Sequence, residues 1–149
     1  YEAMRAQAGG RGLLGFEKIR TYDIQTKVTT ETLYHQDYPY IGMPQETRRY
    51  LRQYLDWDTL AKNQKLSFAS NEYNVKKLQG GKTQFPYLAS GTETQYSLVD
   101  AGTSTTEIST VTTTNTYAVK NDNHANLTGV TVTTFNSSGA EISKVSTTN

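Results

Sequence analysis

Stretches of β-prone residues follow one another along this chain, and short turn sequences separate them. Strands at such regular spacing, with no helical segment between them, predict an all-β antiparallel meander. We expect roughly 7–9 strands, forming an open curved sheet or a sandwich. The expected strands are Leu13–Tyr22, Val28–Tyr34, Glu46–Leu55, Leu66–Leu78, Thr83–Leu88, Glu93–Val99, Ile108–Lys120, Gly129–Asn136 and Ala140–Ser146.

Two parts of the chain leave alternatives open. Residues 1–8 read as a lead-in segment, either a short helix or a disordered stretch. In residues 45–78 the apolar spacing fits a helix as well as strands, and we favour two strands joined by a loop near Asp58–Gln64. Residues 9–149 are predicted to form a single antiparallel β module, with repeat-like units toward 91–149.

A five-residue pattern recurs within the module. Thr30–Tyr34 is repeated as Thr92–Tyr96 and, more loosely, as Thr113–Tyr117. Repeating strand units need neighbours to bury their faces. Because the sequence begins with Tyr1 and ends on another strand-like stretch, we interpret it as a piece of a longer protein that covers its exposed ends.

The composition argues against a thick core. Hydrophobic residues make up only 35% of the chain, below the usual roughly 45–50%. Tyrosine partly compensates, with 11 copies against 4 phenylalanines and 1 tryptophan. Tyrosine buries its ring while its hydroxyl stays near water or a partner, which suits half-buried sheets.

Charge and cysteine content exclude several classes of function. A net charge of +1 favours no nucleic-acid or anionic-membrane partner. The absence of cysteine excludes disulfides and cysteine-based zinc sites. No apolar run reaches the roughly 20 residues of a membrane helix, so we expect no membrane insertion by this chain. We predict no cofactor.

Catalytic and metal chemistry lack support in the sequence. A metal site would need both histidines, His35 and His124, with a carboxylate such as Asp37 or Asp122, all brought together from distant loops. Histidines that pack in loops or lie on the surface are the simpler interpretation. No serine stands in a nucleophile-elbow context, so we expect a non-enzymatic protein.

The segment after Tyr34 predicts a rigid loop that caps the end of the sheet. Pro39 and Pro44 lack N–H donors and fix φ, and Gly42 permits a positive φ. If the flanking rings of Tyr38 and Tyr40, together with Trp57, lay open to solvent, the loop would suit an adhesin-like module that binds a glycan or a host protein. If the rings point inward, a structural role is favoured.

The chain also carries a family resemblance. The phrase Gly10–Phe16 and the later Thr32–Pro44 resemble the region of SpvB-like and toxin-complex B-component proteins that leads into Rhs (YD) repeats. Asn126–Val132 is similar to half of such a repeat, with Ala125 where glycine is usual. Related bacterial surface proteins include some called wall-associated. In this family the strands build a hollow shell around a toxic C-terminal segment.

The resemblance implies a structural module of a large exported bacterial protein, secreted or at the cell surface, that contributes to a shell or stalk. The implied partners are neighbouring Rhs-like β segments of the same parent chain and, where the parent encloses one, a toxin segment. The chain itself is too short to close a shell, and it lacks the Asp/Pro/Gly-rich region that ends such shells by self-cleavage. The structural signature comprises Gly10, Arg11, Gly12, Gly15, Phe16, Tyr34, Gln36, Asp37, Pro39, Gly42 and Pro44. If the Phe16 ring is buried, truncating it to alanine should cost about 3–5 kcal/mol.

Overall fold

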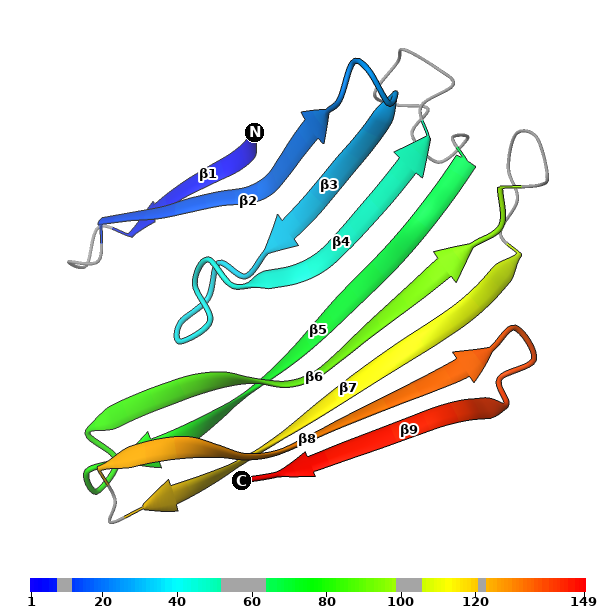
Figure 1. Ribbon diagram of the computed structural model, residues 1–149. Coiled ribbons are helices and arrows are strands. Elements are labelled where there is room, and N and C mark those ends of the chain that lie inside the picture. Colours follow the sequence, from blue (N-terminus) through cyan, green and yellow to red (C-terminus); the bar gives the residue numbers. More distant parts are fainter. Residues whose placement is uncertain (8–11, 52–63, 99–105, 121–122) are drawn as a thin grey trace.

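Nine antiparallel strands form one open sheet, and their order in space is their order in the sequence (Figure 1). The computed structural model describes residues 1–7, 12–51, 64–98, 106–120 and 123–149. The strands are β1 (Glu2–Gln7), β2 (Gly12–Tyr22), β3 (Val28–Tyr34), β4 (Pro44–Leu51), β5 (Gln64–Leu78), β6 (Thr83–Tyr96), β7 (Glu107–Lys120), β8 (His124–Asn136) and β9 (Glu141–Thr148). The predicted all-β antiparallel meander is confirmed, in its open form rather than as a sandwich.

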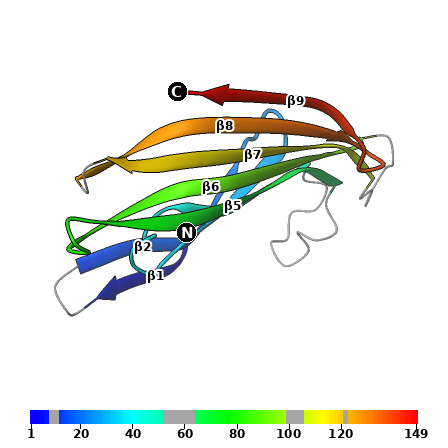
Figure 2. The same cartoon turned by 90° about the horizontal axis from the view of Figure 1, so that it is seen from below.

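The sheet is a single curved and twisted layer. Seen from below, the strands follow one another in one bent layer, and the described strands form no second layer (Figure 2). Contacts between strands join sequence neighbours, from β1 with β2 through to β8 with β9. The strands β1 and β9 therefore form the two open edges of the described sheet.

Apart from shifts at strand ends, such as the start of β8 at His124 instead of Gly129, the predicted and observed strands differ in two places. The segment Glu2–Gln7 is an edge strand paired with β2, rather than a helix or a disordered lead-in. Its local sequence does not reveal this, because the pairing with β2 supplies the ladder and the residues of β1 show no clear strand pattern of their own. The predicted break between Leu88 and Glu93 is also wrong, because β6 runs on through a register shift beside Ala89. A bulge inserts an extra residue without ending the strand.

The predicted turns rest on side-chain hydrogen bonds to the backbone. Between β2 and β3, Asp23 Oδ1 accepts from the backbone N–H of Gln25 at 2.9 Å. Between β8 and β9, Asn136 Oδ1 accepts from the N–H of Ser138 at 3.0 Å. Asp and Asn side chains commonly satisfy backbone donors in turns in this way.

Very little of this sheet is buried. Among the described residues only Tyr50 and Leu78 are buried apolar side chains, at 6% and 4% exposure. The accessible surface is 9351 Å², against about 7,600 Å² expected for a compact protein of this mass. All eight residues of β9 are exposed. The low hydrophobic content therefore corresponds to an uncovered sheet.

We predict that Tyr50→Ala destabilises the chain more than Phe16→Ala. Tyr50 is buried, so its truncation should cost about 3 kcal/mol. Phe16 is only half-buried, and its ring lies 4.8 Å from that of Tyr1, which is 79% exposed. We therefore lower the expected cost at Phe16 to about 1 kcal/mol. Urea unfolding of both variants measures this, and equal losses would contradict the burial described here.

Candidate functional site

The segment between β3 and β4 forms a loop that bonds to itself. The N–H of His35 donates to the carbonyl of Met43, and the N–H of Gly42 donates to the carbonyl of His35, each at 2.9 Å. Within the loop, the N–H of Tyr40 donates to the carbonyl of Asp37 at 2.9 Å. Gly42 takes a φ of 76°, the left-handed conformation predicted from its sequence position.

One side of this loop packs against β5. The rings of His35, Tyr40 and Tyr73 form a cluster with centroid distances of 5.7, 5.6 and 6.2 Å. The Tyr73 hydroxyl and the Asn71 side-chain amide both donate to the carbonyl of Pro44, at 2.9 Å each. Burial raises the pKa of the Tyr73 hydroxyl above its ordinary value of 10.0. Strand β5 thus fixes the end of the loop through these two hydrogen bonds.

The other side of the loop borders an open hollow of about 480 Å³. The residues lining it come from β1, from β2 and from the loop. They are Met4, Arg5, Ala6, Leu14, Gln36, Asp37, Tyr38 and Ile41. Gln36 is only 8% exposed, and neither its amide nitrogen nor its amide oxygen has a hydrogen-bond partner among the described residues.

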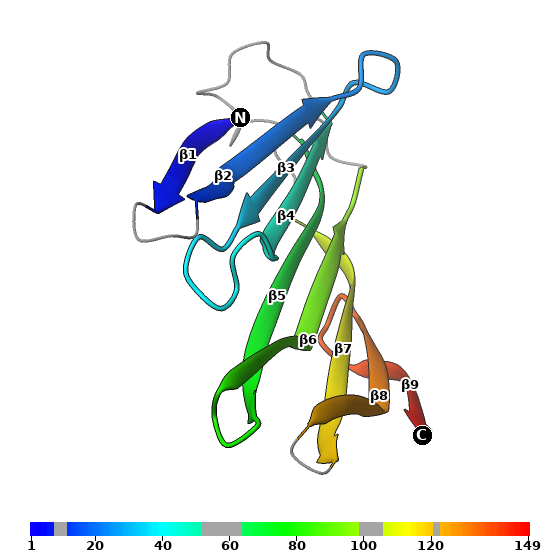
Figure 3. The ribbon, with the colours of Figure 1, turned by 90° about the vertical axis from the view of Figure 1, so that its left-hand side faces the viewer.

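The hollow exists because β2 diverges from β3. The strand β2 pairs with β1 over most of its length but pairs with β3 only from Lys18 to Tyr22. The earlier part of β2 runs beside the loop that follows β3 (Figure 3). A register shift at Arg5/Ala6 and a φ of 90° at Gly15 mark the irregular ladder there.

Most signature residues fall on these neighbouring elements. Gly12, Gly15 and Phe16 lie on β2, Tyr34 ends β3 and Pro44 begins β4. The remaining described members lie in the loop, namely Gln36, Asp37, Pro39 and Gly42. Gly10 and Arg11 lie outside the described residues. The hollow itself was not predicted, because its β1 wall was not recognised as a strand.

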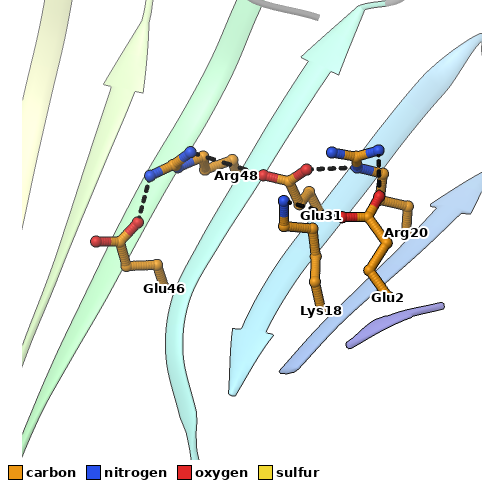
Figure 4. Close-up of polar contacts among 6 residues, drawn as sticks. All are labelled: Glu2, Lys18, Arg20, Glu31, Glu46 and Arg48. Carbon is orange, nitrogen blue, oxygen red and sulfur yellow. Dashed lines mark hydrogen bonds and ion pairs between the residues drawn. The ribbon is translucent and has the colours of Figure 1, made fainter. Parts of the chain in front are cut away.

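A row of alternating charges crosses β1 to β4 (Figure 4). At its centre the Glu31 carboxylate lies 2.5 Å from Arg20 Nε and 3.6 Å from Arg48 Nη1. The Glu31 side chain is only 4% exposed. The outer carboxylates complete the row, with Glu2 2.6 Å from Arg20 and Glu46 2.5 Å from Arg48. Glu31 is paired directly with Arg20 on one side and with Arg48 on the other, so these two contacts favour this register over a slipped one.

The shifted pKa values of Glu2 and Arg48 favour the charged form of both side chains. The pKa of Glu2 is lowered, first by a hydrogen bond from Lys18 and, against a desolvation effect, by the positive charge of Arg20. Burial opposes the charge of Arg48, but the hydrogen bond to Glu46 and nearby negative charges raise its pKa overall. Glu2 and Arg48 are therefore both charged at neutral pH. Sequence reasoning missed it because facing residues are known only once the register is known.

The two tyrosines that flank Pro39 lie in different environments. Tyr38 is 52% exposed and lines the hollow, whereas Tyr40 packs against His35 and Tyr73. Trp57, the third ring of the expected platform, lies outside the described residues. Tyr38 and Tyr40 therefore do not lie together on one exposed surface.

The metal hypothesis finds no assembled site in the described ranges. Within them, no three His, Asp or Glu side chains gather closely enough to hold an ion. His35 belongs to the aromatic cluster, and His124 is exposed at the start of β8. Asp122 lies outside the described residues. Across the same ranges, no helix has the length and apolar character to span a membrane.

Comparisons with protein-family models, with curated protein sequences and with solved structures found no match. The likeness to Rhs and toxin-complex proteins therefore rests on the quoted sequence segments alone.

We predict that Glu31→Gln destabilises the sheet by about 2 kcal/mol. Removing one partner of a buried ion pair costs about 3–5 kcal/mol, but Arg20 and Arg48 keep the carboxylates of Glu2 and Glu46. Glu141→Gln on the exposed strand β9 is the matched control and should change stability by less than about 0.5 kcal/mol. Urea unfolding measures both, and equal effects would show that the row does not stabilise the register.

We predict that acid loosens β1 through Glu2. Because its folded-state pKa lies below the ordinary 4.5, its contribution is present above that value and is lost as the pH falls through the folded-state pKa. Hydrogen exchange of β1 amides, corrected for intrinsic rates, should show lower protection at about pH 3 than at about pH 6. Glu2→Gln should reduce this pH dependence and Glu141→Gln should not. The same pH dependence in all three proteins would exclude Glu2 as its source.

Proposed function

We propose that this chain is a non-enzymatic structural module, a section of a larger β assembly in an exported bacterial protein of the Rhs or toxin-complex kind. The observation that carries the proposal is the open sheet of the described residues, which buries only two apolar side chains and has two edge strands without an outer strand partner. A sheet normally buries at least one face against another layer. The missing layer would come from neighbouring segments of the parent chain, in its shell or stalk.

The edge strand β9 supports this proposal. Its side chains Ile142 and Val145 are 62% and 60% exposed, and the backbone groups on its outer side have no strand partner among the described residues. Proteins usually protect such edges with charges, prolines or covering segments. In β9 the charged residues are Glu141 and Lys144 alone. An edge of this kind suits pairing with a further strand.

The threonine-rich strands also suit a mechanical role. On one face, hydroxyl pairs link neighbouring strands, with Thr94 and Thr110 at 3.1 Å and Thr131 and Ser146 at 3.0 Å. Such cross-strand pairs stabilise a sheet without a thick core. The module would thus supply rigidity and surface to its parent, which we place outside the cell or at its surface on the strength of the resemblance.

We predict that the isolated chain associates with itself through the β9 edge. Sedimentation velocity should show oligomers that grow with concentration, because an unpaired strand recruits another. Ile142→Lys should shift the population toward monomer, since a charge at an edge opposes pairing. Ile24→Lys is the matched control, because Ile24 is similarly exposed, at 72%, but lies in a turn. A wild-type chain that stays folded and monomeric at high concentration would contradict the proposal.

A further inference from the structure

The buried amide of Gln36 is an unusual feature of this molecule. Its nitrogen and oxygen are both shielded from solvent, and neither has a hydrogen-bond partner in the part of the chain that the structure describes. A buried polar group left unpaired costs about 1–3 kcal/mol. The adjoining loop backbone bonds within itself, through His35, Tyr40, Gly42 and Met43. A group kept at such a cost, beside an open hollow, indicates a missing partner.

The strand β2 offers a second set of unpaired groups at the same place. Its first pair with β3 is Lys18 with Leu33. On that side, residues 12–17 have no strand partner in the described part of the chain. Alternate backbone N–H and C=O groups of such a stretch are free to pair with another strand. Leu14, within this stretch, lines the same hollow as Gln36.

We propose that this hollow binds an extended peptide segment of another polypeptide, added along the free side of β2 and held by the Gln36 amide. A primary amide carries a donor and an acceptor, which match the C=O and N–H of a peptide bond. Adding an extended segment to an unpaired strand is a common mode of peptide recognition, in which backbone bonds supply affinity. The proposal stands independently of the function proposed above.

The walls of the hollow fit a neutral peptide with apolar side chains. Met4, Leu14 and Ile41 offer apolar contacts, and Arg5 and Asp37 bring opposite charges. A strongly charged ligand of either sign would be repelled by one of these two residues, Arg5 or Asp37. The volume of about 480 Å³ lies within the roughly 300–1,000 Å³ of typical ligand sites.

The test follows the side-chain amide signals of Gln36 by ¹H–¹⁵N NMR while a capped peptide, acetyl-Val-Thr-Val-Thr-amide, is added to the whole chain. We expect these signals to shift and saturate, and the same peptide N-methylated at alternate residues to bind at least about tenfold more weakly, since it lacks N–H donors. A shift that does not saturate would overturn the proposal. So would equal binding of the N-methylated peptide. A shift driven by protein concentration alone would assign the hollow to a second copy of this chain and would also overturn it.

A variant of the protein provides a second test, in which peptide binding should weaken while the stability of the free protein should rise. Gln36→Met keeps the size of the side chain but removes both polar atoms, so peptide binding should weaken about tenfold. The free variant should unfold at a higher urea concentration than the wild type, because two unpaired buried groups are gone. Gln25→Met, at an exposed turn position, should change neither property. Unchanged binding in Gln36→Met would overturn the proposal, and so would a lower unfolding midpoint, which would show that the amide already has a partner.

Discussion

Backbone hydrogen bonds between consecutive strands are the interaction on which this structure depends. With only Tyr50 and Leu78 as buried apolar side chains among the described residues, hydrophobic burial contributes much less than in a compact domain. A bare ladder specifies its register weakly when neither face is buried. The charged row through Glu31 and the hydroxyl pairs between threonine-rich strands supply the missing specificity.

The sequence predicts those parts of the fold that depend on local chemistry. The strand Val28–Tyr34 was predicted with its observed bounds, because β-branched residues between clear turn signals leave little choice. The strand Glu2–Gln7 was missed, because its pairing depends on β2 and not on its own residues. The continuous β6 was missed because a bulge and a turn look alike in sequence.

The candidate site also combines features that the local sequence predicts with features that depend on how the strands pair. The glycine and prolines of the loop mark its backbone directly, so the loop was predictable from Pro39 and Gly42. The hollow was not, since it arises where β2 leaves β3 and where β1 closes one wall. The structure also separates Tyr38 from the packed Tyr40, a division that their shared place beside a proline conceals.

The sequential strand order affects how the molecule loses its structure. Among the described strands, the extensive contacts join strands that are adjacent along the chain, so most of the stabilising contacts lie between neighbouring strands. Such a molecule behaves as a quasi-one-dimensional array, in which stability is a sum of neighbour terms. Opening can begin at β9 and advance strand by strand while the pairing of β2 to β5 persists. A sheet with this strand order therefore unfolds gradually from its edge strands, rather than in a single all-or-none transition.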